Sequence, residues 1–276
     1  MKKTLKISLI ILGSFLALIL IINIGFSLWL KYKLPDYLKN KTPYQITYQS
    51  LNVEILSGGI SANQLKIKTK QPNNLETIAL KGSLGILNIS RLGVIELLKN
   101  NRIEASSIKL VKPDLRVRLA KPKAGKSGKD PIPFMINNIE IDHGNIGVKR
   151  SDETQLFSAK DLNLNVKNLS LNQDPDELPF ALDSYNITAK DFFFRLDQIY
   201  SITSSDIKTD NGKLEIDDFE MKSLVDFKNW EQSFRSQKSL FGIKSKKLTF
   251  DELVFSKTKL SLKNAQIKDP EFVIQN

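Results

Sequence analysis

The sequence predicts a mainly β protein, in which an N-terminal transmembrane helix is followed by a twisted, bulged antiparallel β-meander that curls into an elongated groove, with one or two short helices. Three observations predict this fold. An uncharged apolar run covers residues 7–30, apolar side chains alternate with a period of two beyond residue 43, and an eight-residue pattern recurs there. The first is typical of a membrane-spanning helix and the second of strands.

The run from Ile7 to Leu30 contains 24 residues and no charge. As a helix it would be ~36 Å long, enough to cross a hydrocarbon core of ~30 Å with some tilt. It is longer than the apolar region of a cleaved signal peptide and does not end in a small-x-small site, which favours an uncleaved signal anchor. We therefore expect residues 1–6 in the cytoplasm, residues 7–30 in the membrane and residues 31–276 outside the cytoplasm.

The net charge of +11 is divided unevenly along the chain. Residues 1–50, 51–100 and 101–130 carry +6, +3 and +6, whereas residues 131–276 carry −4. A basic excess in the membrane-proximal half suits attraction to anionic lipid headgroups, or simply the solvated flanks of an anchor. It does not suit nucleic acid, because such a binder needs a basic stripe with interleaved aromatic residues on its folded domain.

The repeated pattern consists of apolar-x-apolar, two polar positions, and a second apolar-x-apolar. Its eight copies begin at Ile46, Ile60, Ile103, Phe134, Leu164, Leu214, Leu248 and Leu260. In a regular strand the two halves of one copy would face opposite sides of the sheet. A β-bulge at the polar pair would return them to one face and bend the strand, so that successive strands curl into a trough with an apolar inner wall. Without the bulge the strands would cross between the two sheets of a sandwich; we favour the trough because the pattern recurs so often.

Turn and breaker residues divide the pattern into strands. Gly58-Gly59, Asp142–Asn145 and Asp210–Gly212 are typical of hairpin turns. Pro113 and Pro270 mark strand edges or loops, because proline cannot donate to a ladder of backbone hydrogen bonds.

Two stretches have helical rather than strand spacing. Residues 91–98 and 225–237 each place three apolar side chains on one face of a helix, so we expect short helices that cover the apolar wall or plug its ends. The sequence KPKAGKSGKD forms most of a flexible basic linker at residues 121–131. It divides a membrane-proximal groove segment, residues 31–120, from a distal groove segment, residues 132–276.

The residue inventory argues against catalysis. The chain has no Cys and one His, which excludes disulfides and thiolate sites and leaves little for a His-based metal site. Ala120–Ser127 matches a relaxed phosphate-loop pattern, but glycine and prolines follow at once, so no helix can begin there. His143 lies in an expected turn, and Asp217-Asp218 and Asp251-Glu252 occupy the polar pair of the repeat. We expect no enzyme, no catalytic or metal-binding residue and no cofactor.

Three blocks carry a family resemblance. After the anchor comes YQSLNVEILSGGISANQLKI at residues 48–67; residues 83–119 order a strand, a short helix and a strand that ends at a Pro-containing corner; and residues 136–149 are INNIEIDHGNIGVK. In these blocks the chain resembles the AsmA-like family, the TamB-related repeating β-groove proteins of the bacterial envelope. The resemblance implies an inner-membrane anchor, a curled sheet in the periplasm, and a role in phospholipid transport or outer-membrane homeostasis. About 14 strands at ~4.8 Å would give a groove of only ~65 Å, which suits a short chute, a docking module or a subunit rather than a bridge between membranes.

The expected function is therefore a non-catalytic groove that binds membrane lipids, with acyl chains along its apolar wall. The candidate lining residues are Ile103, Ile108, Leu110, Ile139, Ile141, Leu164, Val166, Phe219, Phe250 and Phe255. The alternative is a membrane-tethered scaffold that fills its own core and binds other envelope proteins, for which the edge of the C-terminal strand is a candidate surface. A third hypothesis, an envelope hydrolase, has no residue set to support it.

Overall fold

The computed structural model describes Tyr32, Asp36 and Asn40 and residues 42–54, 58–93, 103–121, 134–171, 180–210, 212–225, 239–255 and 260–275. The expected membrane helix, almost all of the linker and most of the two expected short helices lie outside these residues. Among the described residues, no helix is long and apolar enough to span a bilayer.

The described chain is mainly β-strand, as the sequence predicts. The strands are β1 (Tyr44–Thr47), β2 (Ser50–Glu54), β3 (Gly59–Thr69), β4 (Ala79–Ser90), β5 (Ile103–Val111), β6 (Asp114–Arg118), β7 (Phe134–Lys149), β8 (Gln155–Leu171), β9 (Phe180–Ala181), β10 (Ser184–Arg195), β11 (Tyr200–Asp210), β12 (Lys213–Ser223), β13 (Leu240–Asp251), β14 (Val254–Phe255), β15 (Leu260–Ser261), β16 (Asn264–Lys268) and β17 (Glu271–Gln275).

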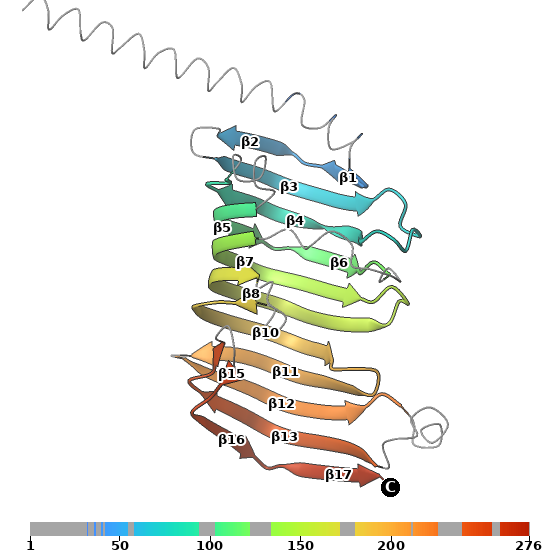
Figure 1. The fold of residues 1–276 in the computed structure, drawn as a ribbon, viewed down its shortest axis with the longest axis vertical. Coiled ribbons are helices and arrows are strands. Elements are labelled where there is room, and N and C mark those ends of the chain that lie inside the picture. Colours follow the sequence, from blue (N-terminus) through green and yellow to red (C-terminus); the bar gives the residue numbers. More distant parts are fainter. Residues whose placement is uncertain are drawn as a thin grey trace, which may run out of the picture.

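Fifteen strands form one sheet, whose order is β1-β3-β4-β5-β7-β8-β10-β11-β12-β13-β16, with β2, β6, β9 and β17 paired beside this path. Only β14 and β15 form a separate pair. Figure 1 shows the strands stacked along the long axis of the molecule in nearly the order of the sequence. The two-sheet sandwich is not observed among the described strands.

We call one level of the sheet a rung. Several rungs consist of two short strands that follow each other in the chain. β1 and β2 pair with β3 in a single register, β5 and β6 do so with β4, and β16 and β17 do so with β13. The path therefore has eleven rungs, and at ~4.8 Å per strand the sheet is about 48 Å long, shorter than the ~65 Å expected from a count of strands.

The expectation of a purely antiparallel meander is wrong at one place. Both β5 and β6 pair with β7 in parallel, so the sheet is mixed, and it is continuous from the membrane-proximal to the distal segment. A parallel pair needs a crossover of about a dozen residues. The chain between β6 and β7, which contains the predicted linker, is long enough to provide it.

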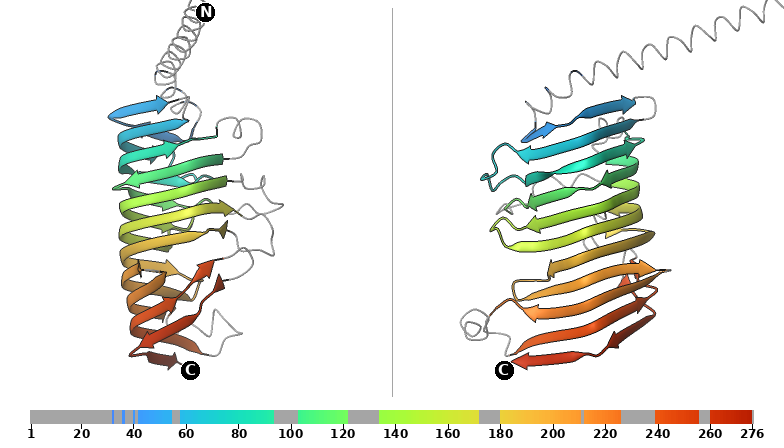
Figure 2. Two further views of the ribbon diagram at one scale, coloured as in Figure 1. Left: turned by 90° about the vertical axis from the view of Figure 1, so that its left-hand side faces the viewer. Right: turned by 180° about the vertical axis from the view of Figure 1, so that it is seen from behind.

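A line of backbone bends, which we call the crease, crosses the whole sheet. Seven non-glycine residues on it have φ between 45° and 51°, and the registers place them at one level to within about one residue. They are Gln64, Lys112, His143, Asp161, Asp191, Asp218 and Asp269. Figure 2 shows the result: the strands curve and the sheet is bent across its width along its whole length.

The bend has the effect expected of the polar pair in the repeat: it keeps both apolar halves of a strand on one face. In β3, Ile60 and Ala62 precede the crease and Leu65 and Ile67 follow it, yet all four belong to one apolar cluster. The left-handed residue, Gln64, shifts the alternation by one position, so both halves of the strand keep their apolar side chains on the same face. A second line of left-handed residues lies six or seven positions away, and at Asn168 and Glu252 it falls on polar pairs that the crease does not use. Its members include Gly58, Arg91, Asn168 and Glu252.

The mechanism differs from a β-bulge in most rungs. A bulge inserts a residue in one strand and shifts the register, but the register is unchanged across the crease between β3 and β4, between β11 and β12, and between β12 and β13. Adjacent strands bend at the same level, so no residue is left over. Register shifts occur in the β7–β8 and β8–β10 pairs.

The expected hairpin at Asp142–Asn145 is also wrong, because β7 runs through it without interruption. Here His143 takes the left-handed conformation of the crease. A Cβ atom on Gly144 would lie 2.8 Å from Ile141 Cγ2 and 3.0 Å from Pro113 Cγ, so glycine allows the close approach of β7 to the β5–β6 rung. Pro113 and Pro270 stand at the crease too, between the halves of their rungs. The hairpins expected at Gly58-Gly59 and Asp210–Gly212 are confirmed.

Candidate functional site

The bent sheet has an apolar face and a polar face, and rows of side chains show the contrast. A row is a set of residues that stand opposite one another on successive rungs. Row A, on one side of the crease, is Leu51, Ala62, Leu87, Leu110, Ile141, Leu164, Ile187, Thr209, Leu214, Phe250 and Ala265. Row B, on the other side, is Tyr44, Thr69, Leu80, Val117, Val148, Phe157, Phe194, Ile202, Met221, Ile243 and Phe272. Each row crosses all eleven rungs without a charged residue.

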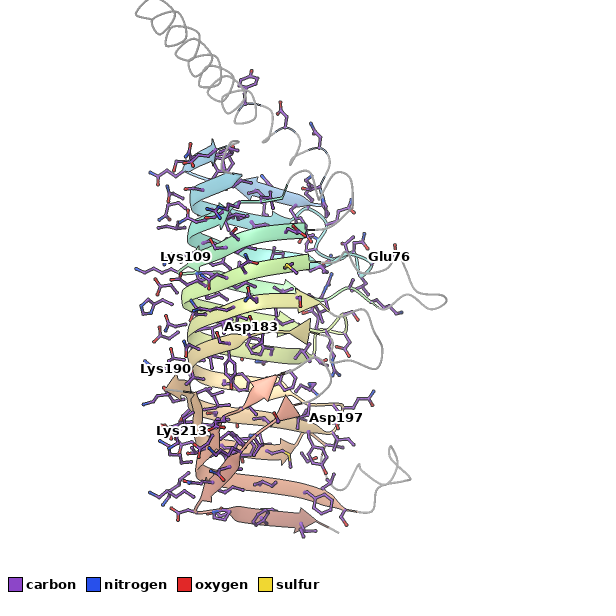
Figure 3. The ribbon with its side chains drawn as sticks, turned by 60° about the vertical axis from the view of Figure 1, so that its left-hand side comes forward. Glu76, Lys109, Asp183, Lys190, Asp197 and Lys213 are labelled. Atoms are coloured by element: carbon purple, nitrogen blue, oxygen red, sulfur yellow. The ribbon has the colours of Figure 1, made fainter. Side chains whose placement is uncertain are left out.

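Charges occupy the opposite face. Figure 3 shows Lys109, Lys190 and Lys213 projecting away from the outer side of the bend. Lys109 stands between Leu110 and Ile108 in the chain and donates to Glu140 Oε1 on the next strand, at 2.5 Å. Because successive side chains of a strand point to opposite faces, the apolar residues lie on one face and the charged residues on the other.

Six of the ten predicted lining residues come together in the middle of the apolar face. Ile108 lies opposite Ile139, and Ile139 opposite Val166; beside them Leu110 lies opposite Ile141, and Ile141 opposite Leu164. These pairs make two adjacent ladders over β5, β7 and β8, as the registers of these strands show.

The other four predicted residues lie elsewhere. Phe250 is in row A on β13, the rung next to the last. Phe219 lies next to the crease, opposite Ser245. Ile103 begins β5, opposite Phe134. Phe255 is in β14, which pairs only with β15, so it is not part of the main sheet.

Sequence reasoning missed two copies of its own repeat. Residues 157–164 and 187–194 read FSAKDLNL and ITAKDFFF, with an alanine before the polar pair Lys-Asp. They supply the apolar cluster at the centre of the crease, in which Ala159, Leu162 and Ala189 are buried. Phe157 and Phe192 make an edge-to-face contact with ring centroids 5.6 Å apart. The signal was present, since Ala62 and Ala105 hold the same position before the polar pair in copies that were found.

The few polar groups on the apolar face bond to the backbone of the bend. The Ser204 hydroxyl lies 2.7 Å from the Asp217 carbonyl oxygen, and the Ser245 hydroxyl lies 2.7 Å from that of Lys268. The Thr69 hydroxyl donates to the Leu80 carbonyl and accepts from the Leu80 N–H. Because these groups are satisfied internally, they offer few free hydrogen-bonding positions to a ligand.

Side chains on the polar face stabilise the crease through hydrogen bonds and ion pairs. The His143 N–H donates to Asn163 Oδ1 at 3.0 Å, and the Asp161 N–H donates to Asn145 Oδ1 at 3.2 Å, so backbone donors left by the bend are satisfied. His143 Nδ1 lies 2.7 Å from Asp161 Oδ1, and Lys190 Nζ lies 3.2 Å from Asp161 Oδ2. The hydrogen bond with His143, then the one with Lys190, lowers the pKa of Asp161 below its usual value.

The apolar face is only partly covered. Ile108, Leu110, Ile139, Ile141 and Leu164 are all half-buried, although strands flank them on both sides. Their remaining exposure is therefore on the face of the sheet, not at its edges. At the C-terminal end, a hollow of about 480 Å³ is lined almost entirely by apolar groups. Its lining residues are Tyr200, Met221, Phe241, Gly242, Ile243, Phe272, Val273 and Ile274.

Comparisons with family models and with curated protein sequences give no match to this chain. What the arrangement offers is apolar surface in two continuous rows, A and B. Among the described residues, no group of three His, Asp or Glu side chains is placed to hold a metal ion.

Proposed function

We propose that this protein is a membrane-anchored envelope protein of the AsmA-like kind, in which the bent sheet forms a trough that binds phospholipid acyl chains without catalysis. Residues 7–30 would hold it in a bacterial inner membrane as a single-pass anchor, with residues 31–276 in the periplasm. Its role would be phospholipid transport or outer-membrane homeostasis. One observation carries the proposal: rows A and B run the length of the sheet with no charged residue, and from the third rung to the last they stay partly exposed.

The dimensions suit acyl chains. An acyl chain spans about half of a hydrocarbon core that is ~30 Å thick, so the partly exposed length of the rows, about 38 Å at ~4.8 Å per strand, is long enough for more than one chain end to end. Each methylene that leaves water contributes ~0.8 kcal/mol. Since the polar groups of the apolar face are bonded to the backbone, such a trough would select for apolar length and width and not for a headgroup.

The experiment is site-specific photo-crosslinking in the full-length chain. A photoreactive residue at Ile139 or Ile108, on the apolar face, is expected to capture phospholipid. The same residue at Glu140 or Lys109, one position along each strand and on the polar face, is the control and is expected to capture none. Equal capture at both pairs, or none at either, would contradict the proposal.

A second candidate function is a tethered scaffold that binds other envelope proteins. It is favoured by the C-terminal end of the sheet, where every described side chain of β16 and β17 is exposed and the last rung has one edge without a described partner. Ile139→Asp separates the two candidates. A scaffold whose apolar face fills itself would be strongly destabilised by this charge, whereas in an open trough the fold would persist and lipid capture would fall.

A further inference from the structure

A row of basic side chains lies on the polar face at the membrane-proximal end. Lys68 of β3 stands opposite Lys81 of β4, and Lys81 stands opposite Arg116 of β6. The next position is Gly147 of β7, and a Cβ atom there would lie 3.2 Å from Arg116 Cδ. The Arg116 side chain is therefore laid across the neighbouring strand, with no side chain beneath it at that point.

This arrangement costs stability. Residues directly opposite on adjacent strands have Cβ atoms about 5 Å apart, and like charges at that distance repel one another. Neither Lys68 nor Lys81 makes an ion pair with any described residue, and Arg116 is paired only with the exposed Asp114, at 3.0 Å. Three adjacent cations with one anion leave a local excess of positive charge.

The distal polar face is arranged differently. Glu215 lies within 4.0 Å of Lys208, Lys213 and Lys247, and Glu220 lies 3.2 Å from both Lys222 and Lys244. Lysines are as frequent there, but carboxylates stand between them. The unbalanced cations of the proximal end are thus not a general property of this sheet.

A hollow of about 840 Å³ lies against the basic row. Six basic residues line it against two acidic ones; the basic side chains come from the polar-face positions of their strands, and Glu153 comes from the turn between β7 and β8. The basic residues are Lys68, Lys81, Arg116, Arg118, Lys149 and Lys160, and the acidic residues are Glu153 and Asp191. A concave, positively charged surface of this kind concentrates anions.

We propose that this face, defined by Lys68, Lys81 and Arg116, binds the phosphate groups of anionic phospholipids at the membrane surface and holds the proximal end of the sheet against the bilayer. The position in the chain argues for a membrane rather than another polyanion. The row begins in the second rung, about 5 Å from the first, and the sequence that leads from residue 30 to the sheet adds Lys31, Lys33, Lys39 and Lys41.

The direction of the basic row also indicates how the sheet would be oriented on the membrane. The row runs along the long axis, across the strands, so Arg116 is two rungs further from the β1 edge than Lys68. If the sheet stood upright on its first rung, the farther cations would lie beyond the ~8–10 Å over which surface charges act in salt. All three reach headgroups together only if the proximal polar face leans against the membrane.

The inference rests on the proposed anchor but not on lipid in the trough, so the two can fail separately. Because the chain has no Cys, Ser83→Cys introduces a single labelling site between Lys66 and Asp114 on the polar face. The full-length, fluorophore-labelled protein would be placed in nanodiscs of phosphatidylcholine, with or without phosphatidylglycerol, that carry a headgroup quencher.

We expect phosphatidylglycerol to increase quenching at position 83 and high salt to reverse it. The triple variant K68Q/K81Q/R116Q should lower the ratio of docked to undocked protein about a hundredfold, since each basic residue at the surface contributes about fivefold. The variant K213Q/K244Q/K246Q removes the same charge from the distal polar face and should dock as the parent does. A variant that keeps the charge, K68R/K81R/R116K, should also dock and controls for folding.

Three outcomes would overturn the proposal. One is quenching that does not respond to phosphatidylglycerol. Another is an equal loss in the proximal and distal triple variants, which would show a general charge effect. The third is a change of fluorescence on adding inorganic phosphate to pure phosphatidylcholine discs, abolished by K68Q/K81Q/R116Q, without a response to phosphatidylglycerol; the face would then bind a soluble phosphate compound.

Discussion

The two ends of the sheet differ in how far the same apolar face is buried. At the N-terminal end, which we call the proximal end, Leu51, Val53 and Leu65 are 6%, 7% and 8% exposed and pack with side chains from both sides of the crease. At the C-terminal end, Phe272 and Ile274 are 67% and 60% exposed. Both ends are edges of one sheet, and the crease passes through both.

The difference shows that bending alone does not bury this face. The crease brings the two arms of a strand toward each other, but side chains are buried only where enough of them meet across the bend, as in the proximal cluster. The C-terminal rung keeps the apolar pattern without such a cluster. We infer that the proximal end contributes more folding free energy than the C-terminal rung, which presents apolar surface and an open strand edge.

The largest expected difference in stability between the two ends comes from replacing a glycine at each. A Cβ atom on Gly82 of β4 would lie 2.0 Å from the Asp114 carbonyl oxygen, a backbone atom that cannot yield without breaking the β4–β6 pairing. Gly82→Ala should therefore lower the free energy of unfolding by about 4 kcal/mol or more. Gly242→Ala in β13 meets Val273 Cβ at an ordinary 3.5 Å and should cost less than about 1 kcal/mol. Urea denaturation of both variants would measure the contrast, and equal losses would contradict it.

The next test compares the loss of a buried leucine at the proximal end with the loss of an exposed isoleucine at the distal end. Leu65→Ala removes a buried side chain from the proximal cluster and should cost about 2–5 kcal/mol, the usual range for a cavity in a core. Ile267→Ala removes a side chain that is 51% exposed at the distal end and should cost about 1 kcal/mol at most. Thermal and urea unfolding would report both values. A larger loss at Ile267 would show that the distal end is as well packed as the proximal one.

Part of this architecture could be predicted from the sequence, because its physical cause is local. An apolar pattern that shifts by one position at a polar pair must put a bend there if both halves are to face one side. Asn63-Gln64 and Asp217-Asp218 are such pairs, and Gln64 and Asp218 are the left-handed residues that make the bend. The same reasoning brought Ile108, Ile139 and Val166 into one ladder.

Other features could not be predicted because they depend on contacts between distant segments. Asp142–Asn145 has the composition of a hairpin turn, and only its position beside Asp161 and Pro113 makes it a crease. The parallel pairing of β5 and β7 is set by a crossover that has no periodic signal. The basic row joins Lys68, Lys81 and Arg116, which become neighbours only through the registers of three strands.

A smaller, pH-dependent effect distinguishes the paired charges of the distal face. The hydrogen bond from Lys247, followed by the nearby charges of Lys247, Lys208 and Lys213, lowers the pKa of Glu215 in the folded protein. A lowered carboxyl pKa stabilises the fold above the pKa of the unfolded chain, about 4.3, and this contribution is lost as the pH falls through the folded value. Glu215→Gln should therefore lower the melting temperature at pH 7 and leave it unchanged in strong acid.

Glu271→Gln is the control, because Glu271 makes no ion pair with a described residue. Its melting temperature should follow that of the parent at every pH. A Glu215→Gln variant whose deficit stays constant from pH 7 to strong acid would show that the carboxylate acts through packing and not through its ion pairs.

The smallest effect on stability is expected where the apolar face is most exposed. Phe272→Ser together with Ile274→Ser should change the free energy of unfolding by less than about 1 kcal/mol, because both side chains already face solvent in the described chain. The same change removes apolar surface from an open edge, so it should reduce self-association, measured by light scattering across a range of concentrations. Phe157→Ser, within the central crease cluster, makes a similar chemical change at a packed site and should cost several times more stability. If the double variant unfolded as readily as Phe157→Ser, the C-terminal end would be a packed part of the fold, and the contrast between the two ends would not hold.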